Sequence, residues 1–380
     1  MPFEQPDPEL AARMAALGLD RISAAAGETP VYLVGGAVRD LLRGVAPEEI
    51  GNLDLAVEGD AIELARALGG ELREHERFGT ATVSVGGREV DLARTRTEVY
   101  ARPGALPEVE AASLAEDLGR RDFTVNAIAV ALAAPGAVID PHGGRLDLAA
   151  GLLRTLHRRS FEDDPTRALR AARYAARLGF ELEAQTEAAL SEADLATVSP
   201  ERVEAELVRL LGEDEWRRGF ELLAEWGLAP RAGLELMEAV RETLARPGWR
   251  GTTDEATAAL VAGAPAIGRY APSAGPLEQA RELAALDEGP PSELAAAARE
   301  SAPVALVIAR AMGAGWLDRY VEEWRDVRLE IDGEDLMAAG IEQGPAVGRG
   351  LAAALAARLD RQVQGREGEL DVALRAAREG

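Results

Sequence analysis

Two short apolar segments near the N-terminus, each with polar groups at one end, limit what this chain can fold into. Residues 31–34 (VYLV) run directly into Gly35 and Gly36, and residues 53–57 (LDLAV) carry Asp54. Apolar runs of this length, bounded by glycine and polar residues, are typical of buried strands. The glycine pair lets backbone N–H groups approach an anion without an intervening Cβ. The pattern therefore predicts two strands that bring a polyphosphate and a metal ion together.

The residues around these strands suit both ligands. Arg39 and Asp40 follow the glycine pair, and a guanidinium can hold a phosphate through two parallel hydrogen bonds. Asp54 suits Mg²⁺, a hard cation that prefers oxygen ligands. The structural alternative is an ordinary glycine turn before a helix. Neither GKS or GKT nor GxGxxG follows the strand, which excludes the P-loop and dinucleotide-binding fingerprints.

Composition restricts the fold and the chemistry. The 380 residues are enough for two or more cores, and the low aromatic content of 4% with Ala- and Leu-rich segments favours a largely helical protein. The absence of Cys excludes disulfides, thiolate zinc sites and a Cys nucleophile. Three His residues make a His-based metal site or a Ser–His–Asp triad a poor candidate. Without a signal sequence or a membrane-spanning apolar run, we expect a cytoplasmic protein with no membrane partner.

The charged residues narrow the choice further. The net charge of −24 argues against a general nucleic-acid coat. All 42 basic residues are Arg, so a Lys base, a Schiff base and a P-loop Lys are excluded. Every cation is a planar, always-charged guanidinium, which suits phosphates and base edges.

The periodicity changes along the chain. A short helix is expected within residues 1–25, and short strands alternate with helices from residue 31 to about residue 138, with a GG hairpin turn inside residues 81–96. Residues 102–117, rich in Pro and Gly, are expected to form a mobile loop. After residue 144 the strand patterns largely stop and apolar residues recur at helical spacing. The fold class is therefore α+β, with a small mixed sheet and helices in the head and helices alone behind it.

A second carboxylate, Asp91, lies on the strand that follows the hairpin turn. Antiparallel pairing could place it beside Asp54, and paired strand carboxylates are how two-metal phosphoryl-transfer sites are built. An ion pair between Asp91 and Arg94 or Arg96 is the alternative, and the sequence leaves both open.

Residues 120–126 (RRDFTVN) gather Arg121, Asp122 and Asn126 within two helical turns. A capped helix with surface charges is one interpretation of this segment. Because the segment follows the expected mobile loop, we favour contact with a ligand.

A helix start follows at Pro165, which comes directly after two aspartates. Arg167, Arg170 and Arg173 recur every three residues and would share a helix face with Asp164. From the residues alone, a solvated face with salt bridges is the better interpretation.

Five segments, in this order and spacing, carry a family resemblance: LVGGAVRD, DLAVEGDA, RRDFTVNA, DPHGGRLDL and EDDPTRALRAARYAARLGF. They resemble the class II tRNA nucleotidyltransferases and bacterial poly(A) polymerases over residues 28–212, and GEDLMAAGIEQGPAVGRGL resembles the tail of long bacterial CCA-adding enzymes. The resemblance implies a nucleotidyltransferase palm in residues 1–144 and a base-recognising neck in residues 145–212. A helical body in residues 213–315 and a tRNA-binding tail in residues 316–380 would follow.

The resemblance also implies site residues and ligands. The ligands are Mg²⁺, CTP, ATP and tRNA, and the reaction is template-independent addition of CMP and AMP to the tRNA 3′ end. The implied residues are Asp54, Asp91 and Asn52 for the metal and catalysis; Gly35, Gly36, Arg39 and Asp40 for the triphosphate; Arg121, Asp122 and Asn126 for phosphate and ribose; and Asp164, Arg167, Arg170 and Arg173 for the base and its support.

The chain departs from the family at the metal motif, DxD, because its first Asp is Asn52. A neutral amide there is compatible with a low-activity paralogue, an inactivated variant or a site that tolerates Asn. Alternative functions within the family are CC-only addition, A-only addition and poly(A) synthesis. The last is disfavoured because no basic C-terminal extension is present to neutralise a long RNA. A catalytically impaired RNA-binding protein is the alternative from another class.

Overall fold

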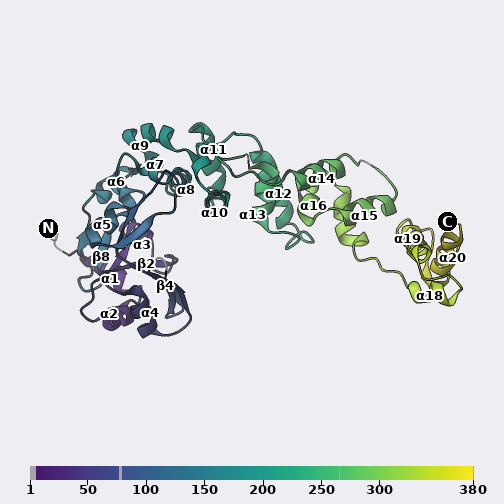
Figure 1. Ribbon diagram of the computed structural model, residues 1–380, viewed down its shortest axis with the longest axis horizontal. Coiled ribbons are helices and arrows are strands. Elements are labelled where there is room, and N and C mark those ends of the chain that lie inside the picture. The colour runs from purple at the N-terminus through teal and green to yellow at the C-terminus, as the bar shows by residue number, and fades with distance from the viewer. Residues whose placement is uncertain (1–5, 77–78, 265, 287, 380) are drawn as a thin grey trace. The chain divides into compact units, whose positions relative to one another are not determined.

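The computed structural model contains two compact units, which are described separately. The first extends to Ala229 and includes Ile267–Tyr270, and the second contains the remainder of the C-terminal half. Figure 1 shows the sheet in the first unit and, among the described residues of the second, helices without strands. The structure describes residues 6–76, 79–264, 266–286 and 288–379.

A seven-stranded sheet forms the head of the first unit, in the order β3-β4-β5-β2-β1-β8-β9. Both strands expected from the opening motif are present with the expected bounds, and β1 pairs antiparallel with β2 and β8. The strands are β1 (Val31–Val34), β2 (Leu53–Val57), β3 (Leu72–His75), β4 (Thr80–Val85), β5 (Arg88–Arg94), β8 (Ala129–Ala131) and β9 (Val138–Ile139).

Strands β2 and β5 pair in parallel, not antiparallel as considered from the sequence. The chain passes from β2 through helix α4 (Ala61–Leu68) and the β3–β4 hairpin, and the expected GG turn then leads into β5. These reversals make β5 run in the same direction as β2. The resulting register still sets Asp54 directly opposite Asp91.

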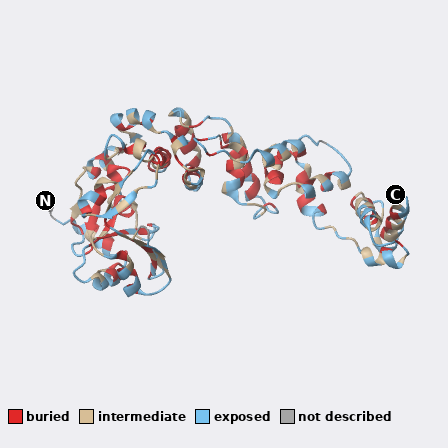
Figure 2. Cartoon of the chain, in the orientation of Figure 1, coloured by how far each residue is buried: buried red, intermediate tan, exposed pale blue. Residues whose placement is uncertain are grey.

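The two faces of the sheet have different roles. On one face, Leu53, Leu55 and Val57 of β2 join the main core with helices α1 (Pro8–Ala15), α2 (Asp20–Ala26), α3 (Gly36–Leu42) and α4. Ala56 belongs to a smaller cluster on the other face, with residues of α5 (Leu114–Gly119). Because side chains alternate along a strand, Asp54 shares this second face. Figure 2 shows buried residues in the head and along the helices that follow it in the chain.

Two expectations for the head, one for residues 1–25 and one for residues 102–117, are wrong. Two helices, α1 and α2, occupy the region where one short helix was expected. Residues 102–117 are also not one mobile loop, because they contain strand β7 (Glu108–Ala111), which pairs with β6 (Arg96–Val99), and the start of α5. Ser113 and Glu116 form a capping box that fixes the start of α5.

Helices dominate the rest of the first unit, as expected, apart from a two-residue ladder between β10 (Leu152–Leu153) and β11 (Glu181–Leu182). Helix α8 is the central element, and its buried face includes Leu169 and Ala172. The helices are α6 (Gly144–Ala150), α7 (Ser160–Asp163), α8 (Thr166–Leu178), α9 (Ala184–Ala189), α10 (Pro200–Leu211) and α11 (Trp216–Glu225).

The second unit is helical and has two cores. One surrounds Trp249 and Leu317, and the other surrounds Leu336, Ala354 and Ala373. No helix in the described part of the chain combines the length and the hydropathy needed to span a bilayer. The helices are α12 (Leu234–Ala245), α13 (Glu255–Gly263), α14 (Ala274–Ala284), α15 (Pro291–Glu300), α16 (Pro303–Ala311), α17 (Trp316–Arg319), α18 (Gly333–Ala338), α19 (Pro345–Leu359) and α20 (Gly365–Arg378).

Candidate functional site

A cavity of about 530 Å³ lies in the first unit, between the second face of the sheet and helices α8 and α10. Its lining comes from the β1–α3 turn, β2, β5, the segment after α5, and these two helices. Most of the residues singled out from the sequence line this one cavity. The lining includes Gly35, Gly36, Asp54, Asp91, Arg121, Asp122, Asn126, Asp164, Arg167 and Arg170.

Two carboxylates lie side by side in the cavity wall. Asp54 and Asp91 are register partners on neighbouring parallel strands, which lie about 4.8 Å apart, so their side chains project from the same face. Thr82 Oγ1 donates a hydrogen bond to Asp91. Asp54 opens onto the cavity, yet the surrounding protein raises its pKa; nearby Arg121 lowers it in part and Asp91 raises it further. Such a pair attracts a cation because two close negative charges repel each other without one.

The donor set fits one divalent cation that prefers oxygen. Asp54 and Asp91 supply anionic oxygens, and water and phosphate oxygens can complete the coordination of Mg²⁺. Asn52 lies two residues before Asp54, is exposed, and is not among the described residues that line the cavity. The described part of the chain contains no cluster of three or more His, Cys, Asp or Glu residues suited to a metal. The site thus has two carboxylates where the family motif leads one to expect three.

The glycine turn lies against this carboxylate pair. Gly35 has φ +71°, and a Cβ there would stand 3.2 Å from Arg121 Nη1 and 3.4 Å from Asp54 Oδ2. The backbone conformation therefore favours glycine, and a Cβ there would also crowd the Arg121 guanidinium. Arg121 also donates to buried Asp117 at 3.0 Å, which holds the guanidinium beside the turn. The turn brings backbone, a guanidinium and a carboxylate together where a phosphate and a cation can meet.

Arg39 and Asp40 lie behind the cavity wall and do not line the cavity. The Arg39 side chain is only 2% exposed, and its Nε and Nη2 each donate to Asp40 at 2.9 Å. Its Nη1 donates to Asn126 Oδ1 at 2.8 Å. In this conformation each of the three guanidinium nitrogens donates within the protein, and Arg39 supports Asn126 in place of the direct phosphate contact inferred from the sequence.

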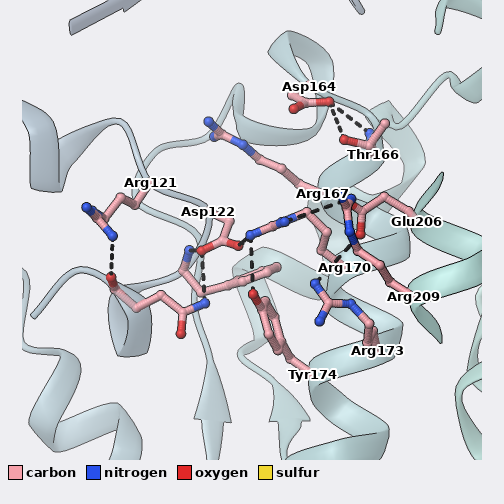
Figure 3. Close-up of polar contacts among 12 residues, drawn as sticks. Arg121, Asp122, Asp164, Thr166, Arg167, Arg170, Arg173, Tyr174, Glu206 and Arg209 are labelled. Carbon is pink, nitrogen blue, oxygen red and sulfur yellow. Dashed lines mark hydrogen bonds and ion pairs between the residues drawn. The ribbon is translucent and has the colours of Figure 1, made fainter. Parts of the chain in front are cut away.

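A buried carboxylate joins the sheet to helix α8. Asp122 Oδ1 accepts from Asn126 Nδ2 at 3.0 Å, and its Oδ2 accepts from Arg170 Nε at 2.9 Å. Burial alone would raise the pKa of Asp122, but Arg170, Asn126 and Arg167 hold it well below its usual range. The segment itself is a 3₁₀ turn (Thr124–Asn126), not the capped helix considered from the sequence. Asp122 is thus ionised and fixed at the cavity wall (Figure 3).

Asp164 and Arg167 line the cavity, but they do not form the expected i,i+3 ion pair. Asp164 precedes α8 in an extended conformation, with φ −135°, and is therefore not on the helix face. Its Oδ1 accepts from Thr166 N at 3.1 Å and from Arg202 Nη2 at 2.8 Å. Arg167 instead donates to Ser160 Oγ at 2.6 Å and to a backbone carbonyl. In the described part of the chain, no hydrogen bond reaches Asp164 Oδ2.

The expectation of a solvated salt-bridged face on α8 is also wrong. Arg167 is 5% exposed and Arg173 is 9% exposed, because neighbouring helices cover this side of α8. The ring of Tyr174 lies among three guanidinium groups, with Cζ-to-centroid distances of 5.4 Å for Arg39, 5.6 Å for Arg170 and 4.6 Å for Arg173. Arg167 and Arg170 line the cavity, whereas Arg173 lies beside Glu206 and Glu213 and does not line it.

Helix α10 contributes residues that the sequence reasoning missed. Arg202, Glu206 and Arg209 line the cavity, and Glu206 is 6% exposed. In Figure 3, Glu206 lies among Arg170, Arg173 and Arg209. Their spacing of four and three residues, which puts polar groups on one helical face, was the signal that could have found them.

Comparisons with known proteins agree with this geometry. Residues 31–154 match the family described as "Poly A polymerase head domain", and residues 179–237 match "Probable RNA and SrmB- binding site of polymerase A". The CC-adding tRNA nucleotidyltransferase of Deinococcus radiodurans is 37% identical over 355 residues, which cover 88% of this chain and 86% of that protein. The A-adding tRNA nucleotidyltransferase of Halalkalibacterium halodurans is 44% identical over 209 residues, covering 51% of this chain and 48% of that protein.

Solved structures are similar along almost the whole chain. A CCA-adding enzyme in complex with ATP has a TM-score of 0.78 and 28% identity, covering 99% of each chain. The Thermotoga maritima CCA-adding enzyme complexed with tRNA has a TM-score of 0.71 and 27% identity, also covering 99% of each chain. These likenesses confirm the α+β fold class.

The protein belongs to the tRNA nucleotidyltransferase and poly(A) polymerase family, as the motifs indicated. The matched part covers less than half of three A-adding relatives, between 20% and 48% of their length.

Proposed function

We propose that this protein adds CMP and AMP to the 3′ end of tRNA without a nucleic-acid template. The observation that supports this proposal most directly is the single cavity lined by the carboxylate pair, Asp54 and Asp91, by the Gly35 turn and by Asp164. This arrangement suits a nucleoside triphosphate whose phosphates reach the carboxylates and whose base reaches Asp164. The relatives named CC-adding and A-adding enzymes support tRNA, CTP and ATP as substrates.

In this reaction the 3′-hydroxyl oxygen of the acceptor bonds to the α-phosphorus, and the bond to the pyrophosphate oxygen breaks. Asp54 and Asp91, with Asn52 as a weaker neutral donor, would hold Mg²⁺, which neutralises charge on the phosphates and on the attacking oxygen. The Gly35–Gly36 backbone and Arg121 hold the phosphates. The protein supplies position and fixed charge, with no covalent intermediate.

The middle of the cavity would hold the ribose. Asp122 and Asn126 are the polar groups there, and Arg170 fixes the first of them. Arg39 and Asp40 act indirectly, because they position Asn126. We assign nucleotide binding to this set as a whole.

Base selection falls to Asp164 and Arg167. Cytosine and adenine each present an amino donor beside a ring-nitrogen acceptor, whereas uracil and guanine present the reverse. Asp164 Oδ2 can accept from the amino group, and a free N–H of Arg167 can donate to the ring nitrogen. A wrong base would leave buried polar groups unpaired, at a cost of about 1–3 kcal/mol each. Arg170 and Arg173 support this wall.

The remaining assignments follow from the family. The head would be residues 1–144, the neck 145–212, the body 213–315 and the tail 316–380, with the helical parts holding tRNA. We place the protein in the cytoplasm, where tRNA is its substrate.

A direct assay tests the function. The protein is incubated with Mg²⁺, labelled CTP and ATP, and tRNA that lacks its 3′ CCA; the expected product is longer by three nucleotides. Two further reactions, CTP alone with tRNA lacking CCA and ATP alone with tRNA ending in CC, separate complete from C-only and A-only addition. C-only addition is the second candidate, favoured by the likeness to the CC-adding enzyme over most of the chain. Binding of tRNA without incorporation would instead identify a catalytically impaired RNA-binding protein, the alternative that Asn52 suggests.

A further inference from the structure

We propose that the α10 rim, defined as Ala205, Glu206 and Arg209, binds the last nucleotide of the acceptor RNA, with Arg209 on its backbone phosphate. The inference rests on the proposed function, because that reaction needs two substrates in one cavity. All three residues line this cavity.

The incoming nucleotide accounts for most of the other polar lining. Its phosphates belong with the glycine turn and the carboxylate pair, and its base belongs with Asp164. The α10 rim lies on a separate helix and is not needed for either contact. It is therefore a part of the lining that remains available to the acceptor strand.

Arg209 is the accessible cation of the rim. Its side chain is 57% exposed, and Nη1 donates to Glu206 Oε1 at 2.5 Å. Arg170 and Arg173 also lie near Glu206, at 3.6 and 3.7 Å, but they are mostly buried and each has a second carboxylate partner. Of the three arginines around Glu206, only Arg209 combines exposure with a single ion-pair partner among the described residues. Its side chain can turn to a phosphate and give up only its ion pair with Glu206.

The surroundings of Glu206 allow Arg209 to move away from it. Its side chain is 7% exposed, and no donor in the described structure bonds its Oε2. The Nε of Arg173 is buried and likewise has no acceptor. When Arg209 leaves Oε1, the carboxylate can close the 3.7 Å gap to Arg173, so the buried charge stays compensated. Exchange of Arg209 from Glu206 to a phosphate therefore leaves no isolated buried charge.

The test compares Arg209→Gln with a matched control, Arg66→Gln. Arg66 is 58% exposed and donates to Glu74 at 2.6 Å on the head surface, away from the cavity. The measurements are the Kd for tRNA lacking CCA and the KM values for tRNA and CTP. We expect Arg209→Gln to raise the tRNA Kd and KM about five- to ten-fold and to leave the KM for CTP unchanged. The slope of log affinity against log salt should fall by about 0.7–1, the contribution of one phosphate contact. Arg209→Lys should restore most of that slope.

A modified RNA identifies the phosphate. Replacing the last internucleotide phosphate of the tRNA with a neutral methylphosphonate should weaken binding to the parent protein but have little further effect on Arg209→Gln, because coupled groups are non-additive. Additive losses would show that Arg209 does not contact that phosphate. Equal effects of the Arg209 and Arg66 variants, or an equal rise in the KM for CTP, would also overturn the proposal.

The two proposals fail in different ways. If no tRNA is extended by the parent or by Asn52→Asp, the proposed function fails. The Kd, the salt slope and the methylphosphonate cycle need no turnover and would still decide the role of Arg209.

Discussion

Asn52 offers the sharpest test of the metal site. Asp54 and Asp91 supply two anionic oxygens, and Asn52, two residues before Asp54, supplies a neutral one at best. A new carboxylate at position 52 would lie within several ångströms of the cation. Two unit charges 4 Å apart in water attract by about 1 kcal/mol, so a dication and a carboxylate gain about 2 kcal/mol, or roughly thirty-fold. We use the value for water because residue 52 is exposed.

We therefore expect Asn52→Asp to raise the rate of CMP addition by one to two orders of magnitude at limiting Mg²⁺. The assay is single-turnover addition to tRNA lacking CCA, across a Mg²⁺ series. Part of the gain should disappear at saturating Mg²⁺, because the new charge also improves metal binding. The Kd for tRNA should stay within about two-fold, since the metal touches only the end of the substrate.

Asn52→Ala is the control for the amide oxygen. If that oxygen is a ligand, Asn52→Ala should be slower than the parent and should need more Mg²⁺. Rapid addition by the parent, with no gain in Asn52→Asp and no loss in Asn52→Ala, would refute the assignment of this position to the metal site.

Four further predictions concern base selection, the glycine turn, Asp54 and the C-terminal core. Asp164→Ala should allow incorporation from UTP or GTP, measured as the ratio of kcat/KM for CTP to that for UTP; an unchanged ratio would move base selection elsewhere. Gly35→Ala should cost about 1–3 kcal/mol in urea unfolding, because its conformation is unfavourable for residues with a Cβ and Arg121 leaves little room; an unchanged midpoint would contradict that strain. The pKa of Asp54 is raised in the folded protein, so its ionised form at neutral pH opposes folding. Asp54→Asn should accordingly raise Tm while abolishing addition. In the parent, Mg²⁺ activation should be lost on acidification at a higher pH than an ordinary Asp would give. Glu369→Ala should destabilise the α18–α20 core by about 2–3 kcal/mol, because it removes a fully buried carboxylate that accepts from Glu330 N and pairs with a guanidinium; hydrogen exchange in α20 would show faster opening, and unchanged protection would contradict the prediction.

Local pattern determined much of the first unit. The apolar runs, the glycine pair and the GG turn placed β1, β2 and the β4–β5 hairpin, because strand and turn preferences act over a few residues. The same preferences predicted the change to helices after residue 144. Local motifs singled out Gly35, Asp54 and Asp122, and the family resemblance added Asp164; all four line one cavity. Polar residues placed next to short buried segments carry this information in the sequence itself.

Tertiary structure decided which of these residues line the cavity. Asp91 lies opposite Asp54 through parallel pairing, which depends on the whole path through α4 and the β3–β4 hairpin. Arg39 follows the glycine pair, yet it turns away to Asn126, 87 residues later in the chain. No local spacing predicts either result, because the contacts join residues far apart in sequence.

Helix α10 makes the same point for another wall of the cavity. Arg202 and Glu206 have an ordinary amphipathic spacing, and nothing in that pattern says that they meet Asp164 and Arg170. The packing of α10 against α8 brings them together and leaves Arg209 accessible at the rim. Local sequence therefore identifies the chemical groups of the site. Their pairing follows from burial, because only a folded core can hold several guanidinium groups around one carboxylate.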